Sequence, residues 1–166
     1  KEAAADLKTA LGERTEDLVA MKTLARVYDA LGDHVSSLGV LEKLCAVEAN
    51  DIGNWTNRGF ELTSLGRYEE ALTIYGKALA LDKDEPTALS DRAYALMKLG
   101  RNQEALADVE RSLKSYPSNA FALRTRALLR LAKGEREKAC ADLHLAHVIG
   151  GVPEVDQLIE KNCGGI

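Results

Sequence analysis

The sequence predicts an all-α fold, a solenoid of antiparallel helix pairs, from three observations. First, Gly32, Gly66, Gly100 and Gly134 recur at a fixed interval of 34 residues. Second, the composition holds 5% aromatic residues and three prolines, which favours helices over strands. Third, apolar residues recur at intervals of three and four, the period of an amphipathic helix. A fixed period of this length is typical of a solenoid, in which each repeat buries its apolar face against its neighbours.

Residues 1–17 predict only half of a repeat. Ala3, Leu7 and Ala10 lie on one face of a helix that ends at Gly12. A shift of 34 or 68 residues places the same positions on the second helices of later repeats. We therefore interpret this segment as a second helix without its first, which indicates a piece cut from a longer array.

The first full repeat is expected over residues 18–51. Its apolar positions predict a first helix over 16–31 and a second over 35–48. Gly32 stands between them, and a glycine at positive φ lets the chain reverse within two or three residues.

The second repeat, residues 52–85, shows the clearest pattern. It resembles the tetratricopeptide repeat, a 34-residue helix–turn–helix unit with a characteristic tryptophan, glycine, alanine and aromatic spacing. The matching positions are Trp55, Gly59, Ala71, Tyr75 and Ala78, and the departures are Arg58, Leu62 and Lys83. We expect Trp55 to pack in the core, and the small Gly59 and Ala71 to lie where two helices approach closely.

Two further repeats, 86–119 and 120–153, keep the turn glycine and a proline near the end of the repeat, Pro117 and Pro153. The resemblance implies a right-handed superhelix and a single domain over residues 1–166. Residues 154–166 complete it as a capping helix and tail. Val155, Leu158 and Ile159 form the apolar face that covers the last repeat.

The sequence contains no catalytic motif and no phosphate-binding glycine loop, so we expect neither an enzyme nor a cofactor. Cys140, His144 and His147 stand at i, i+4 and i+7 on one helix, a spacing that metal ligands can use. Cys140 and His147 occupy apolar repeat positions, however, so we favour packing and expect no metal. Cys45, Cys140 and Cys163 lie far apart without a CxxC motif and predict no disulfide framework.

Composition also limits the partners. The net charge of −4 without a basic cluster argues against nucleic acid, and no apolar run of about 18 residues predicts a membrane span. The sequence does not identify the localisation of the protein. Cysteines without a disulfide pattern favour a reducing compartment, which gives a preference for the cytoplasm.

Three arginines recur every 34 residues at a position where the family usually has leucine: Arg58, Arg92 and Arg126. One interpretation is a ladder for an acidic ligand. The other follows from Asp108 and Asp142, which share the same interval on the second helices. We favour the second, in which arginine and aspartate pair inside the helical stack, as in a variant of the family.

The resemblance implies a concave groove lined by the first helices. Its composition, aromatic residues with a few cations, is typical of a peptide-binding groove. We predict a non-catalytic protein–protein interaction module that binds a peptide or helix there; the alternative is a structural or self-association segment of a larger protein. The predicted groove residues are Lys22, Arg26, Asn57, Phe60, Asp91, Tyr94, Met97, Lys98, Phe121, Arg124 and Leu128.

Some family members resemble clamps for the carboxylate-terminated tails of heat-shock chaperones. Lys22 and Asn57 match two positions of that clamp, but Thr87 and Asp91 stand where a lysine and an arginine belong. Since Asp91 would repel a carboxylate, we predict no meaningful binding of such a tail.

Overall fold

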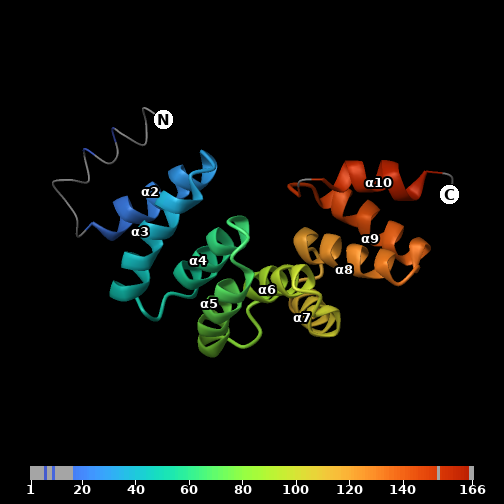
Figure 1. Cartoon of the computed structure of the whole chain (residues 1–166), viewed down its shortest axis with the longest axis horizontal. Coiled ribbons are helices and arrows are strands. Elements are labelled where there is room, and N and C mark those ends of the chain that lie inside the picture. Colours follow the sequence, from blue (N-terminus) through green and yellow to red (C-terminus); the bar gives the residue numbers. More distant parts are fainter. Residues whose placement is uncertain (1–5, 7–8, 10–16, 153, 165–166) are drawn as a thin grey trace. The chain divides into compact units, whose positions relative to one another are not determined.

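The computed structural model describes residues 6, 9, 17–152 and 154–164, so most of the expected half-repeat over 1–17 lies outside the described residues. The described residues form α-helices and turns, without a strand among them. Their helices are α2 (Leu18–Ala30), α3 (His34–Val47), α4 (Ile52–Ser64), α5 (Tyr68–Leu81), α6 (Pro86–Lys98), α7 (Asn102–Ser115), α8 (Ala120–Ala132), α9 (Arg136–Ile149) and α10 (Val155–Cys163) (Figure 1).

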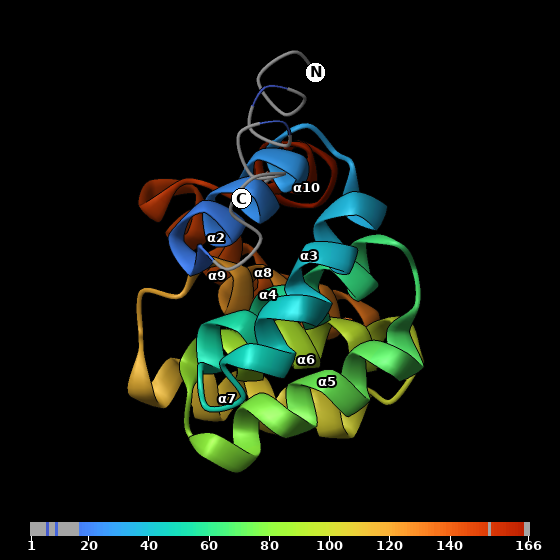
Figure 2. The ribbon, with the colours of Figure 1, turned by 90° about the vertical axis from the view of Figure 1, so that its left-hand side faces the viewer.

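The helices follow the sequence period. First helices begin at residues 18, 52, 86 and 120, and second helices begin at residues 34, 68, 102 and 136. The two helices of each pair lie side by side (Figures 1 and 2). The predicted all-α architecture of serial helix pairs is confirmed, whereas its handedness and the repeat limits stay predictions. Residue contacts divide the chain into two compact units, Lys1–Leu81 and Asp82–Ile166, and each is described by itself.

Each pair reverses direction at the recurring glycine. Gly32, Gly66, Gly100 and Gly134 have φ of 71°, 74°, 76° and 77°. At the second of these turns, Gly66 N donates to Thr63 O at 3.0 Å, a bond that satisfies a carbonyl at the helix end. The predicted left-handed turn is thus confirmed at all four positions.

Helices α4 and α5 of the first unit approach each other closely. Gly59 on α4 faces the ring of Tyr75 on α5, which is fully buried. A Cβ atom added at Gly59 would lie only 2.7 Å from Tyr75 Cδ1. Trp55 is also buried, and its indole N–H donates to Ala49 O at 2.8 Å. The predicted packing roles of Trp55 and Gly59 are confirmed.

The second unit contains two of the expected arginine–aspartate pairs. Arg92 donates to Asp108 from Nε at 2.7 Å and from Nη2 at 2.8 Å. Arg126 makes the same two-pronged contact with Asp142, at 2.9 and 2.7 Å. Both aspartates are buried, so each guanidinium balances a carboxylate inside its helix pair. The structural interpretation of these arginines is confirmed.

The capping helix corrects one expectation. Helix α10 packs on α9, with Leu158 and Ile159 against a buried cluster that includes Leu143. A disulfide joins Cys140 on α9 to Cys163 at the end of α10. The prediction of no disulfide framework, with the thiols as packing residues, is corrected at this bond, because the returning capping helix brings together two thiols that are 23 residues apart. The preference for a reducing compartment rested on that prediction and loses its basis.

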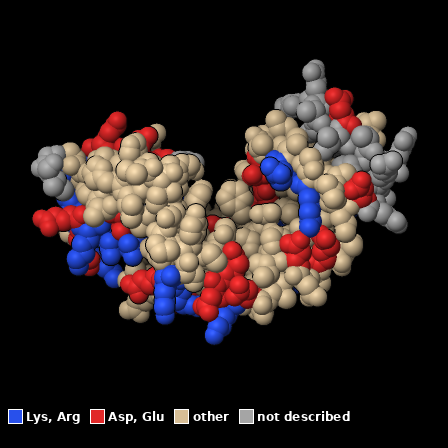
Figure 3. Space-filling view, turned by 180° about the vertical axis from the view of Figure 1, so that it is seen from behind, with Lys and Arg blue, Asp and Glu red and all other residues tan. Residues whose placement is uncertain are grey.

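No helix in the described part of the chain combines the length and the apolar character that crossing a membrane requires. On the face drawn in Figure 3, acidic and basic side chains lie interspersed among uncharged ones. The expectation that nucleic acid is not a partner stays a prediction.

Candidate functional site

The first unit contains a pocket of about 350 Å³ between α2, α3 and α4. The four groove residues predicted in this unit, Lys22, Arg26, Asn57 and Phe60, all line it. Phe60 exposes 38% of its surface although its ring is apolar. The 34-residue period places these side chains together because they lie on corresponding faces of successive first helices.

Lys22 is held in place by two carboxylates. Its Nζ lies 2.8 Å from Glu48 Oε2 and 2.7 Å from Asp51 Oδ2. Hydrogen bonds to Asp51 and Glu48 raise the pKa of Lys22. The charge of Lys22 is therefore already balanced within the protein, whereas Arg26 and Asn57 are exposed at the same pocket.

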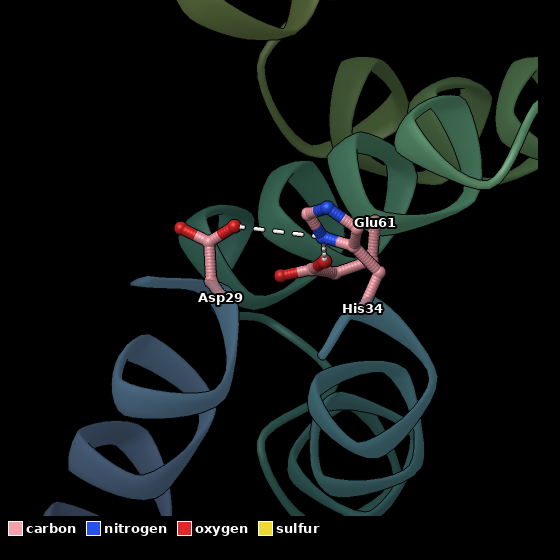
Figure 4. A group of neighbouring side chains, drawn as sticks. All are labelled: Asp29, His34 and Glu61. Atoms are coloured by element: carbon pink, nitrogen blue, oxygen red, sulfur yellow. Dashed lines mark hydrogen bonds and ion pairs between the residues drawn. The ribbon is translucent and has the colours of Figure 1, made fainter. Parts of the chain in front are cut away.

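One wall of this pocket carries a polar cluster that the sequence analysis missed. Glu61 on α4 is almost completely buried, with a side-chain exposure of 3%. It accepts hydrogen bonds from Ser37 Oγ at Oε1 and pairs with His34 Nδ1 at Oε2, both at 2.7 Å. Burial raises the pKa of Glu61, and these hydrogen bonds partly oppose the rise. Asp29 completes the cluster, as Figure 4 shows.

The second unit carries the remaining predicted groove residues on α6 and α8. The Tyr94 ring has two cations over it: Lys98 Nζ lies 5.2 Å and the Arg124 guanidinium carbon 4.9 Å from its centroid. Arg124 also lies 6.0 Å from the Phe121 ring centroid. Such cation–π contacts stabilise an arrangement in which cationic and aromatic groups share one surface.

Three other predicted groove residues of the second unit are half-buried. Met97 and Leu128 are half-buried on α6 and α8. Asp91 is half-buried as well, and desolvation raises the pKa of its carboxyl to about 7, with a smaller contribution from the charge of Glu85. Asp91 therefore differs from an ordinary surface aspartate because its charged form is disfavoured.

Two other features singled out in the sequence are Arg58, the first of the recurring arginines, and the stripe of possible metal ligands on α9. Arg58 lacks an aspartate at the equivalent position and donates instead to Glu42 Oε1 at 3.0 Å. The stripe of possible metal ligands on α9 is not assembled into a site, since Cys140 is in the disulfide and His147 pairs with Asp156 at 2.6 Å.

Comparisons with known proteins agree on the repeat. One family model, described as TPR repeat, matches residues 59–100, and another, described as tetratricopeptide repeat, matches residues 90–144. A comparison with curated proteins gives no match.

Solved structures with the same fold come from several proteins. The thermophilic TPR protein TTC0263 of Thermus thermophilus is 20% identical, with 97% of this chain and 89% of that chain covered and a TM-score of 0.80. The type IV pilus biogenesis factor PilW is 21% identical, with 95% and 73% covered and a TM-score of 0.77. The first TPR of Spaghetti (RPAP3), solved bound to the HSP90 peptide SRMEEVD, is 23% identical, with 72% and 94% covered and a TM-score of 0.66. The two family-model matches, together with the 34-residue helix pairs, show that the chain belongs to the tetratricopeptide repeat family.

Proposed function

We propose that this chain is a non-catalytic protein–protein interaction module that holds a peptide or helix of a partner protein. The repeat family is generally a non-catalytic scaffold, and the first TPR of Spaghetti was solved with a bound peptide. The observation that carries the proposal is the pocket of the first unit, where an exposed phenylalanine stands among polar side chains. Partner sites commonly combine an apolar anchor with a few polar groups that orient the ligand.

The pocket suggests how a segment would be held. Phe60 offers apolar surface to one side chain of the ligand, and burial of that contact supplies affinity. Arg26 and Asn57 can hydrogen-bond to carbonyl groups of the ligand backbone, which would set its direction. Lys22 contributes little net charge because Glu48 and Asp51 already surround it.

The second unit offers a separate surface with a different chemistry. The rings of Tyr94 and Phe121 lie beside Arg124 and Lys98, so this surface is both aromatic and cationic. It suits an acidic or aromatic side chain of the ligand, which can stack on a ring and approach a cation at once.

The proposal is tested by selecting binders from a displayed library of short peptides and measuring the affinity of the selected peptides. Phe60→Ala should weaken binding to the first unit at least tenfold, whereas Val47→Ala, which truncates an exposed apolar residue outside the pocket, should not. For the second unit, the peptide affinity of Tyr94→Ala is compared with that of a control, Tyr116→Ala. Tyr116 serves as the control because it is half exposed and lies at the end of α7.

Equal affinity of all four variants would refute the proposal. The alternative function, self-association, would appear in sedimentation as a mass that rises with protein concentration. Melting temperatures are measured in parallel, because a variant that loses binding by unfolding would not test either function.

A further inference from the structure

Four residues of the first unit meet at one place: Asp29, His34, Ser37 and Glu61. Two of them, Ser37 and Glu61, depart from the repeat pattern. The equivalent residues 34 positions apart are Thr63, Met97 and Leu131 for Asp29; Tyr68, Asn102 and Arg136 for His34; Ala71, Ala105 and Ala139 for Ser37; and Ala95 and Leu129 for Glu61. A buried glutamate where later repeats bury alanine or leucine costs stability unless its charge is compensated. The two departures, Ser37 and Glu61, therefore lie together, in one local group with Asp29 and His34.

The group brings potential ligand atoms from three helices to one point (Figure 4). Asp29 lies near the end of α2, His34 begins α3, and Glu61 lies on α4. His34 Nδ1 is 2.7 Å from Glu61 Oε2 and 3.7 Å from Asp29 Oδ1, and the ligand atoms of the three residues all lie within 4.8 Å of one another. A hydrogen bond accounts for the first distance but not for the second, which is too long.

We propose that Asp29, His34 and Glu61 form a binding site for a divalent transition-metal ion of the zinc class. Zinc bonds to nitrogen and oxygen measure about 2.0–2.2 Å, so two ligand atoms of one tetrahedral ion lie about 3.4 Å apart. The two distances from His34 Nδ1 stand on either side of this value. Binding would release the proton of the His34 Nδ1–Glu61 Oε2 hydrogen bond to solvent, and His34 would keep its other proton at Nε2. Small rotations of the three side chains would then place all of them around one ion.

The donor set selects the class of ion. One imidazole and two carboxylates suit Zn²⁺ better than Mg²⁺ or Ca²⁺, which prefer oxygen ligands alone. The two carboxylates would balance the charge of the ion, and this removes the cost of the buried Glu61 carboxylate, whose pKa burial raises. Asp29 and Glu61 line the 350 Å³ pocket, which leaves room for water as a fourth ligand.

Ser37 gives the site a supporting contact. Its buried hydroxyl lies 2.7 Å from Glu61 Oε1 and 3.1 Å from Ala25 O, so it fixes the orientation of the carboxylate and leaves Oε2 directed to the other ligands. Hydrogen bonds of this kind orient metal ligands in known sites. At the equivalent positions of later repeats, alanine can make no such contact.

The test is a Zn²⁺ titration of the full chain, first treated with a chelator and with its disulfide intact, in competition with a chromogenic chelator. The wild-type protein should bind one ion. Asp29→Asn, His34→Gln and Glu61→Gln should each weaken binding at least tenfold, because each replaces a carboxylate or imidazole ligand by a neutral amide, which binds the ion less well. Glu61→Gln retains the volume and the hydrogen-bonding capacity towards Ser37 and His34, so its effect isolates the charge.

Two controls distinguish this site from adventitious binding. His147→Gln removes an exposed histidine that also contacts an aspartate, and it should leave the affinity unchanged. Proton–nitrogen NMR spectra should show Zn²⁺ at Nδ1 of His34. Failure of the wild-type protein to bind one ion would overturn the proposal, as would equal affinities of wild type and Asp29→Asn. Since the Asp29 side chain is 44% exposed, that variant should fold normally, and peptide binding is not needed for any of these measurements.

Discussion

Replacement of Gly59 by alanine should destabilise the first unit although alanine is the better helix former. The new methyl carbon would lie 2.7 Å from Cδ1 and 2.8 Å from Cζ of Tyr75, whereas carbon atoms in contact prefer about 3.5–4.0 Å. The Tyr75 ring is fully buried, and its hydroxyl lies 3.1 Å from Thr63 Oγ1, so the ring has little freedom to withdraw. Overpacking of this kind costs about 1–3 kcal/mol, which exceeds the gain of about 0.5–1 kcal/mol in helix propensity.

Gly39 on α3 provides the matched control. It is exposed, and a Cβ atom added there meets no atom within 4 Å. Gly39→Ala should therefore stabilise the protein by about 0.5–1 kcal/mol, the propensity term alone. Urea unfolding followed by the fluorescence of the single tryptophan, Trp55, reports on the unit that contains both glycines.

A double-mutant cycle identifies the cause. Tyr75→Leu removes the ring atoms that the methyl group would meet, so Gly59→Ala should cost much less in that background than in the wild type. If Gly59→Ala stabilises the wild-type protein as Gly39→Ala does, then α4 and α5 do not approach as closely as the structure shows, and the reasoning is refuted.

Four further perturbations have defined outcomes. Reduction of the Cys140–Cys163 disulfide, which spans 23 residues, should lower the free energy of unfolding by about 3 kcal/mol; equal denaturation midpoints with and without reductant would contradict this. Because the folded state raises the pKa of Asp91 from 3.8 to about 7, it retains a proton that the unfolded chain releases, so stability should fall as pH rises between these values. Asp91→Asn should flatten that decline in denaturation curves recorded across the range. Calorimetry with an acidic chaperone tail should detect no binding, since Lys22 is already paired and Asp91 replaces a required cation; a low-micromolar Kd would show the exclusion to be wrong. Gly134→Ala should cost on the order of 1 kcal/mol through its φ of 77° alone, because its Cβ would meet no neighbour; thermal melts that match the wild type would disprove it.

The periodic features of the fold could be predicted because the same type of residue recurs at the same position of each repeat, where the structure needs it. Each turn glycine adopts positive φ, and Gly59 packs against an aromatic ring as its spacing indicates. The pairing of Arg92 with Asp108 also follows from the period, since both residues recur at it. These predictions needed only residue identity and interval.

Features confined to one repeat could not be found in the same way. Glu61 lies at a position where the period predicts an apolar side chain, and only its buried contacts with His34 and Ser37 show its role. The Cys140–Cys163 disulfide depends on where α10 docks, and an interval of 23 residues carries no information about that. A comparison of each core position with its equivalents in the other repeats would have marked Glu61 as unusual.

The disulfide changes the order in which the second unit can lose its structure. In a linear array the terminal element has a single neighbour, so it normally separates first and unravelling proceeds inwards. Here α10 is the last helix that the structure describes, and a covalent bond keeps it beside α9. Unravelling from the carboxyl end would therefore have to release α9 and α10 as one piece, together with the Arg126–Asp142 ion pair that joins α9 to α8. The same bond holds α10 on the surface of α9 that it covers, so another helix could take that place only after the disulfide is reduced.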